Sequence, residues 1–114
     1  MRSPTERVRD MLEAISRIER YAVRGRQVFD ADELIQTFVL HNLQILCEAA
    51  YKLPDDLLSA HPEVPWDKMQ GMRHILVHDY FRMDPEIVWN VVQNDLPRLK
   101  AQLEAILGAM GTIP

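Results

Sequence analysis

Apolar residues recur at alternating intervals of three and four positions near the start of the chain. They are Val8, Met11, Ile15, Ile18 and Ala22. This spacing places them on one face of a helix, with most of the intervening charged residues on the opposite face. Ser3, Pro4 and Glu6 add an N-cap serine, a proline in the first helical position and a glutamate that completes a capping box. The pattern predicts a helix that begins at Pro4 and ends near Gly25.

A second helix is predicted over residues 34–51, where apolar side chains occupy more than one stripe of the helix surface. We expect Asp30 to be its N-cap, with Glu33 reaching back to the cap and Phe29 packing onto Leu34 as a hydrophobic staple. A helix at the surface of a domain needs only one apolar stripe. This helix is therefore expected to contact both the core and a second molecule, and a second copy of the chain is the simplest candidate.

Three of the seven prolines fall within residues 52–65, which predicts an irregular connection with at most a short helical turn near its middle. Pro65 can open a third helix over residues 66–78. Gly71 inside it costs about 1 kcal/mol relative to alanine, so we expect another backbone to pack closely there. The expected apolar face of this helix consists of Trp66, Met69, Met72, Ile75, Leu76 and Val77.

The last helical region is expected to begin at residues 84–86, an N-cap aspartate followed by proline and glutamate. Apolar residues then follow at helical spacing, namely Val88, Val92, Leu96, Leu99, Leu103 and Ile106. Pro97 cannot donate a hydrogen bond to the carbonyl of Gln93. We therefore expect this helix to kink or break near residues 94–95.

No stretch alternates between apolar and polar residues over the length of a strand, and the chain has no internal repeat. The sequence therefore predicts an all-α, up-and-down bundle of four to five helices in a single domain, residues 1–114. Cys47 is the only cysteine and cannot form an internal disulfide, and the N-terminus lacks the apolar stretch of a signal peptide. No segment reaches the roughly 20 apolar residues of a membrane span, so we expect a cytoplasmic protein that does not bind membranes.

The net charge of −4 argues against a non-specific nucleic-acid binder, but the charge is unevenly distributed. Residues 1–27 carry seven arginines and four acids, a local charge of +3, whereas the remainder carries six basic and thirteen acidic residues, a charge of −7. Such polarity could steer a phosphate chain to one face of the molecule. The alternative interpretation is an ordinary solvated helix whose polar side is rich in arginine.

The common sequence motifs for binding nucleotides and zinc are absent, and the densest group of chemically active side chains lies in residues 71–81. This segment contains a guanidinium, two imidazoles, a carboxylate and a phenol within eight positions. They belong to Arg73, His74, His78, Asp79 and Tyr80. The segment falls between the expected end of one helix and the cap of the next.

On a continuous helix Arg73 and His78 point about 140° apart, whereas Arg73 and Tyr80 nearly align. Arg73 and His78 can act on one phosphate only if the helix unwinds near His78 or if a second protomer supplies one of them. His74 and His78 have the spacing by which two helical imidazoles can hold one metal ion, but no third ligand is identifiable. A further alternative is an ordinary surface pair of Arg73 and Asp79 beside two histidines at a helix end.

The segment over residues 61–89 resembles the HepT-like toxin family of the HEPN superfamily. Residues 45–50 and 95–99 are also similar to the second and last helices of that family, so the resemblance spans nearly the whole chain. The hallmark of the family is an arginine followed after four to six residues by a histidine, with the subgroup pattern Arg-x4-His-x-Tyr. That pattern is present here as Arg73, His78 and Tyr80.

The resemblance implies a metal-independent endoribonuclease that needs no cofactor, cleaves RNA such as mRNA or tRNA, and dimerises so that two Arg-His motifs line one composite cleft. It also implies an antitoxin partner, a minimal nucleotidyltransferase that transfers AMP to Tyr80. Family members commonly have asparagine after the motif arginine, and this chain has His74 there. A polar side chain is kept, but the amide is lost.

RNA carries its own nucleophile, the 2′-hydroxyl, so a metal-free nuclease needs a base, a cation for the charge on phosphorus and an acid for the leaving oxygen. His78 is the natural base because imidazole titrates near neutral pH. Arg73 is the natural cation because its planar fork fits two phosphate oxygens. The acid could be His74, Tyr80 or the His78 of a second protomer.

Two further residues are candidates for supporting roles. Glu48 interrupts an apolar stretch, where an acid is costly unless it is paired, and it could orient Arg73 or His78; the alternative is that it points to solvent. Asp79 follows His78 directly. A function of a different class is a non-catalytic helical partner that positions substrate for a nucleotidyltransferase, but the intact Arg-His-Tyr pattern favours the nuclease.

Overall fold

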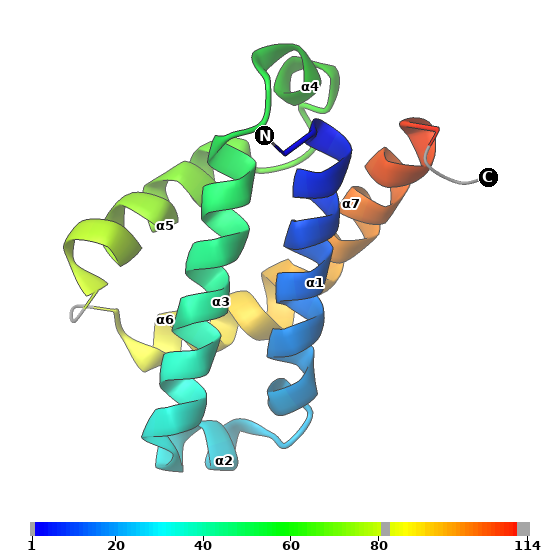
Figure 1. Ribbon diagram of the computed structural model, residues 1–114. Coiled ribbons are helices and arrows are strands. Elements are labelled where there is room, and N and C mark those ends of the chain that lie inside the picture. Colours follow the sequence, from blue (N-terminus) through cyan, green and yellow to red (C-terminus); the bar gives the residue numbers. More distant parts are fainter. Residues whose placement is uncertain (1, 81–82, 112–114) are drawn as a thin grey trace.

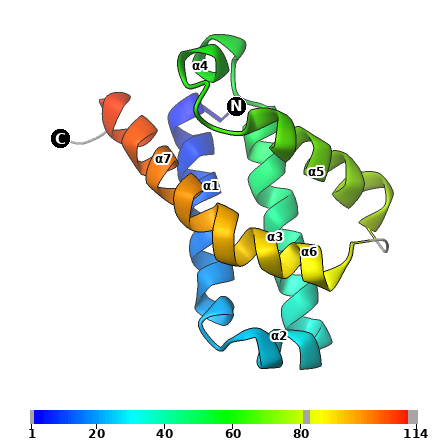
Figure 2. The same cartoon turned by 180° about the vertical axis from the view of Figure 1, so that it is seen from behind.

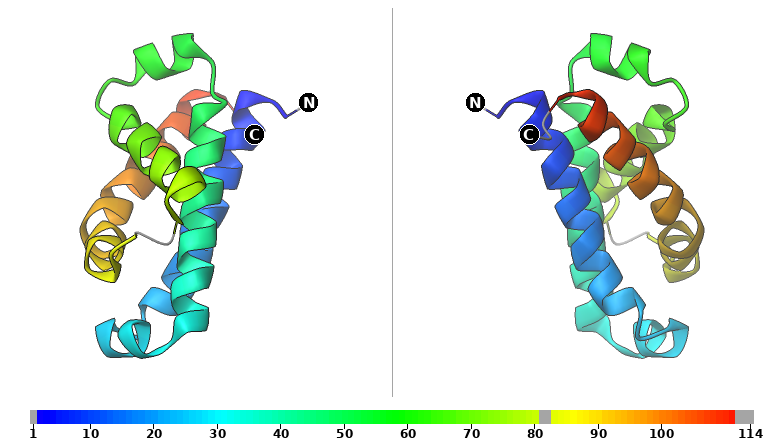
Figure 3. Two further views of the ribbon diagram at one scale, coloured as in Figure 1. Left: turned by 90° about the vertical axis from the view of Figure 1, so that its left-hand side faces the viewer. Right: turned by 90° about the vertical axis from the view of Figure 1, so that its right-hand side faces the viewer.

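The computed structural model describes residues 2–80 and 83–111, and within them every regular element is helical. Three long helices lie side by side in one layer, α1 (Pro4–Ala22), α3 (Glu33–Tyr51) and α5 (Trp66–His78), with α3 in the middle (Figure 1). A second layer crosses behind them and consists of α6 (Pro85–Asn90), η2 (Val91–Asp95) and α7 (Leu96–Ala109) (Figure 2). The short helices α2 (Arg26–Ala31) and α4 (Asp55–Ala60) lie at opposite ends of the molecule (Figure 3). The predicted all-α bundle is confirmed.

Helix α1 begins as its sequence predicts. The side chain of Ser3 accepts a hydrogen bond from the Glu6 N–H at 3.1 Å, and the Ser3 N–H donates to Glu6 Oε1 at 3.2 Å, so both halves of the capping box are present. Five residues of α1 are buried in the core, namely Val8, Met11, Ala14, Ile15 and Ile18. Four of these five belong to the apolar pattern that predicts the helix.

The predicted start of the second long helix is wrong by two residues. Asp32, not Asp30, is the N-cap of α3, and its carboxylate accepts hydrogen bonds from the N–H groups of Leu34 and Ile35. Phe29 does not staple onto Leu34. Phe29 is buried in α2 against the ring of Trp89, 5.2 Å away between ring centroids, and Leu34 is 81% exposed.

The wide apolar surface of α3 is covered within the chain. Helix α1 packs on one side of α3 and α5 on the other, while α2 contacts its N-terminal end. The buried residues of α3 include Ile35, Val39, Leu43, Leu46 and Cys47. Two neighbouring helices in the same chain therefore account for more than one apolar stripe, and this feature does not require a second molecule.

Helix α5 has the predicted bounds, but two predictions about its surface are wrong. Ile75 and Val77 are 41% and 43% exposed, because the helix packs against α3 through only one side, where Met69 and Leu76 are buried. Gly71 is also exposed, and a Cβ atom added there would meet nothing within 4 Å. No backbone packs closely on Gly71 in the described part of the chain.

The last helical run continues through Pro97, and its direction changes between α6 and α7 (Figure 2). The carboxylate of Asp84 caps α6 by accepting a hydrogen bond from the Glu86 N–H at 2.9 Å, as predicted. The expected irregularity takes the form of a π-helical turn, in which the N–H of Leu96 bonds to the carbonyl of Val91, five residues earlier. The extra residue of this turn accommodates the missing N–H of Pro97 without ending the run. Among the described residues, no helix has the length and apolar character needed to cross a membrane.

Candidate functional site

The Arg-His-Tyr pattern lies at the C-terminal end of α5 and in the residues that follow it. The helix stays regular through His78, and its cap is Asp79, whose backbone leaves the helical region at φ −134° and ψ 37°. The chain therefore bends after His78, not before it. Along an unbroken helix, Arg73 and His78 keep their difference of about 140° in direction, so the bend does not turn both toward one point within a single protomer.

Arg73 points toward α3, where two side chains hold its guanidinium group. Its Nε donates to Glu48 Oε1 at 2.6 Å, in an ion pair whose two side chains are 28% and 30% exposed. Its Cζ atom lies 3.8 Å from the centroid of the Tyr51 ring, which is cation–π geometry. Glu48 and Tyr51 are three residues apart on α3, so they occupy neighbouring places on one face of that helix.

This arrangement fixes the direction in which Arg73 presents its charge. Glu48 takes up Nε, and within the described residues no other side chain is hydrogen-bonded to the guanidinium group. The two terminal Nη nitrogens form the fork that can bind two phosphate oxygens. Arg73 is therefore oriented by its partners while its anion-binding end is left available.

The two histidines occupy the exposed surface of α5. The ring centroids of His74 and His78 lie 4.6 Å apart with the rings tilted by 48°, and both residues are exposed. Among the described residues, no cluster of three or more histidine, cysteine or acidic side chains could hold a metal ion. The two imidazoles thus form a pair on the exposed side of α5.

Tyr80 and Asp79 follow the end of α5. Tyr80 is 38% exposed, and its backbone carbonyl accepts a hydrogen bond from the Met83 N–H at 3.2 Å. Asp79 is partly buried, and its N–H donates to the carbonyl of Ile75 at 2.7 Å. Asp79 therefore ends the helix, and the chain leaves it so that Tyr80 lies at the surface two residues from His78.

The sequence interpretation missed Tyr51 as a member of this site. Its position three residues after Glu48 on a predicted helix was a usable signal, because residues at this spacing share a face. Sequence spacing alone did not show that Arg73, 22 positions later, would lie over the Tyr51 ring. That contact depends on how α5 packs against α3.

Comparison with known proteins finds similarity over most of the chain. The model of the HepT-like family, described as Ribonuclease HepT-like, matches residues 11–106. A protein of Thermococcus cleftensis named as a probable ribonuclease HepT is 36% identical over 109 residues, covering 92% of this chain and 96% of the relative.

Two more distant relatives carry similar names. A candidate RNase of Methanocaldococcus jannaschii, MJ1380, is 35% identical over 68% of this chain and 72% of its own. A candidate RNase of Caldanaerobacter subterraneus, TTE0752, is 32% identical over 79% of this chain and 80% of its own. No solved structure matches the chain at a significant level. The family match and the extent of the similarity together establish that the chain belongs to the HepT-like ribonuclease family.

Proposed function

We propose that this HepT-like protein is the toxin of a toxin–antitoxin pair and cleaves RNA without a metal ion, at a composite site between two protomers. The observation that carries the proposal is the placement of Arg73. Glu48 and Tyr51 hold it with its Nη end available, in a member of a ribonuclease family whose motif histidine is exposed on the same helix.

The proposed cleavage uses the 2′-hydroxyl of RNA as nucleophile. His78 removes the proton from the 2′-oxygen as that oxygen attacks phosphorus, and Arg73 stabilises the negative charge that develops on the two non-bridging oxygens. The bond from phosphorus to the 5′-oxygen breaks, and an acid protonates the leaving 5′-oxygen. The products are a 2′,3′-cyclic phosphate and a 5′-hydroxyl end. Candidates for the acid are His74, Tyr80 and the His78 of the second protomer.

The regular geometry of α5 favours a site shared between two protomers. Arg73 faces α3, whereas His78 lies about 140° further round the same helix. A second copy related by two-fold symmetry can bring its own His78 toward the first copy's Arg73, and the symmetry then forms two equivalent sites. Dimerisation would in this way bring an Arg73 and a His78 to one phosphate, which the bend after His78 does not do within a single protomer.

We further propose that an antitoxin nucleotidyltransferase inactivates the protein by modifying Tyr80. The Tyr80 phenol oxygen would attack the α-phosphorus of ATP, forming a phosphodiester with AMP and releasing pyrophosphate. The exposure of Tyr80 supports access by such an enzyme. The added anion would lie two residues from His78, where it would repel RNA phosphates and could bind Arg73 itself.

RNA cleavage in excess EDTA tests the nuclease proposal. We expect the wild-type protein to cut a single-stranded RNA, and expect Arg73→Ala and His78→Ala each to reduce the rate by at least about 100-fold while melting normally. Arg20→Ala and His61→Ala are matched controls on other elements and should cut like wild type. Cleavage that appears only when Mg²⁺ is added would contradict the mechanism.

The modification proposal has a separate test. The protein is coexpressed with a minimal nucleotidyltransferase, the proposed antitoxin, and its intact mass is measured. We expect a discrete increase for each AMP added, loss of RNA cleavage in the modified protein, and no increase for Tyr80→Phe. An unchanged mass, or AMP attached to Tyr51, would refute this part of the proposal.

A further inference from the structure

An open groove of about 330 Å³ runs between α1 and α3, on the face that also carries the contact between Glu48 and Arg73. We call it the α1–α3 groove. Six charged side chains line it: Arg7, Asp10, Glu13 and Arg17 from α1, Glu48 from α3, and Lys52, which caps the C-terminal end of α3. Neither the family motif nor the proposed reaction assigns a role to this groove.

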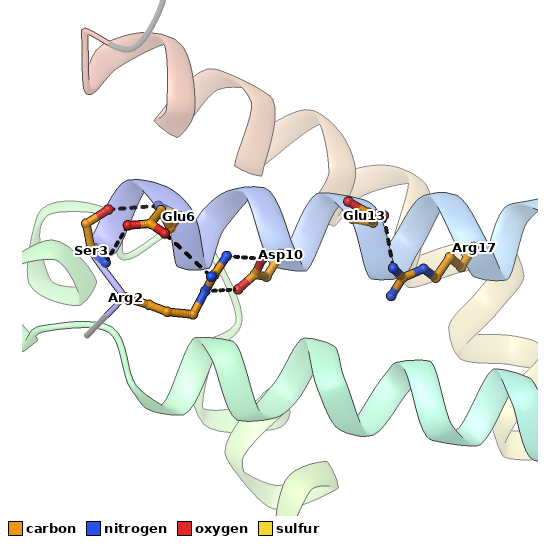
Figure 4. A network of polar contacts seen from close by, with 6 residues as sticks. All are labelled: Arg2, Ser3, Glu6, Asp10, Glu13 and Arg17. Atoms are coloured by element: carbon orange, nitrogen blue, oxygen red, sulfur yellow. Dashed lines mark hydrogen bonds and ion pairs between the residues drawn. The ribbon is translucent and has the colours of Figure 1, made fainter.

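Each carboxylate of the groove is already bound to an arginine. Asp10 accepts two hydrogen bonds from Arg2 at 2.6 Å, and Glu13 accepts one from Arg17 at 2.9 Å, as Figure 4 shows. Glu48 is bound to Arg73 at 2.6 Å. The acids of the groove thus hold and orient cationic side chains, and their own charges are compensated.

Two groove cations have no such partner. Arg7 and Lys52 form no ion pair with any residue in the described part of the chain. Arg2 also pairs with Glu6 at 3.5 Å. Counting the groove residues together with Arg2, Arg73 and Glu6, five cations face four carboxylates, a local charge of +1. The groove is therefore locally positive in a protein whose net charge is −4. It draws on the excess of arginine near the N-terminus, which otherwise has no assigned role.

The groove is connected to the candidate active site through Glu48 of α3. Glu48 lines the groove, and its carboxylate also accepts a hydrogen bond from Arg73 of α5. Figure 1 shows α1, α3 and α5 side by side in this order, so a chain that leaves the α1–α3 groove toward α5 crosses α3. Arg7 and Arg17 are ten residues apart on α1, roughly 15 Å, which is the rise of about four stacked nucleotides.

We propose that the α1–α3 groove binds the sugar–phosphate backbone of single-stranded RNA beside the scissile bond. This inference rests on the proposed nuclease function. Arg7 and Lys52 would each neutralise one phosphate, and Arg2 and Arg17 would add positive potential from the rim. Binding would be largely independent of sequence, because charge on phosphate carries no base information.

The test measures binding of an RNA that cannot be cut. A fluorescent single-stranded RNA with 2′-O-methyl groups lacks the nucleophile, so its affinity for the wild-type protein can be followed by anisotropy between 50 and 200 mM salt. The groove variant is Arg7→Gln with Lys52→Gln. Its matched control is Arg9→Gln with Arg20→Gln, which removes two exposed cations of α1 that do not line the groove.

We expect the groove variant to lose roughly 25-fold in affinity at 0.1 M salt, since each lost phosphate contact costs roughly fivefold. The slope of log affinity against log salt should become shallower by about 1.4, or about 0.7 for each contact on a single strand. For the control variant, the changes in affinity and in salt slope should both be much smaller than these values. Charge-preserving substitutions, Arg7→Lys with Lys52→Arg, should restore most of the affinity, which separates lost charge from a damaged fold.

Three results would overturn the proposal. The groove variant could bind RNA like its control, or the wild-type protein could bind a duplex better than the single strand. The third is a groove variant that changes oligomeric state while its intrinsic RNA affinity stays the same. Failure of the nuclease proposal looks different. In that case unmodified RNA would stay uncut by every form of the protein, whatever the affinity of the methylated strand. If only the groove proposal fails, the groove variant cuts RNA as the wild type does.

Discussion

Replacing Glu48 by glutamine tests whether the position of Arg73 limits catalysis. The substitution keeps the shape of the side chain and an oxygen that can accept from Arg73 Nε, but it removes the negative charge from a 2.6 Å contact. The guanidinium keeps its place over Tyr51 with less restraint. We therefore expect Arg73 to bind phosphate and to be less well positioned for the transition state.

The structure sets the size of the effect. A hydrogen bond to a charged group contributes about 1.5–3 kcal/mol, and the partial exposure of both side chains, 28% and 30%, reduces this to about 1–2 kcal/mol. If that energy is realised in the transition state, kcat falls by about 5- to 30-fold. KM should stay the same or decrease, because the substitution removes a negative charge beside the proposed RNA-binding site. The free energy of unfolding should change by about 1 kcal/mol or less.

Steady-state cleavage of a fluorescent RNA measures kcat and KM separately, and chemical denaturation measures stability. Glu19→Gln is the matched control, because Glu19 accepts a hydrogen bond from Lys100 at 3.0 Å and ties α1 to α7 away from the site. A rise in KM at constant kcat, or an equal fall in kcat for Glu19→Gln, would show that Glu48 does not act by positioning Arg73.

Three further predictions concern the fold. Gly71→Ala should raise the free energy of unfolding by about 0.5–1 kcal/mol in denaturant titrations, because the residue is exposed in a helix with open space around its Cα; a loss of stability would reveal a close neighbour at this position. Burial raises the pKa of the Cys47 thiol to about 12, so we expect iodoacetamide at pH 8 to label the unfolded protein but not the native one, and rapid native labelling would contradict the burial. The hydrogen bond from the Ser3 N–H lowers the pKa of the Glu6 carboxyl below its usual 4.5, so the capping box stabilises the fold above that pH and the stabilisation is lost as the pH falls further. The difference in melting temperature between wild type and Glu6→Gln should therefore shrink below pH 4.5, and a difference that grows on acidification would disprove this role.

The sequence predicts the elements whose signals are local. Ser3 with Glu6 and Asp84 with Pro85 mark helix starts that the structure confirms, because each cap is completed by residues within three positions. The start of α3 is different. Asp30 and Asp32 both resemble N-caps, and the burial of Phe29 against Trp89, sixty residues later, favours a separate short helix before Asp32.

The same distinction applies to the candidate site. The pattern of Arg73, His78 and Tyr80 is visible in the sequence, and so is Glu48 as a possible partner of Arg73. Tyr51 was not predicted, because its contact with Arg73 exists only once α5 lies against α3.

The exposed surface of α5 was also predicted poorly. Helical periodicity shows which residues share a side of a helix, but it does not show which of those sides will be covered. Gly71, Ile75 and Val77 lie on the sides of α5 that α3 does not cover. Their exposure depends on packing between segments far apart in the chain.

Complementation between two inactive variants tests the composite site most directly. Differently tagged Arg73→Ala and His78→Ala chains are coexpressed, the mixed dimer is isolated through both tags, and RNA cleavage is measured in EDTA. If one protomer's Arg73 works with the other's His78, the mixed dimer has one intact site and should recover about half of the wild-type rate per dimer. A mixed dimer no more active than either variant alone would contradict a site shared across the two-fold axis.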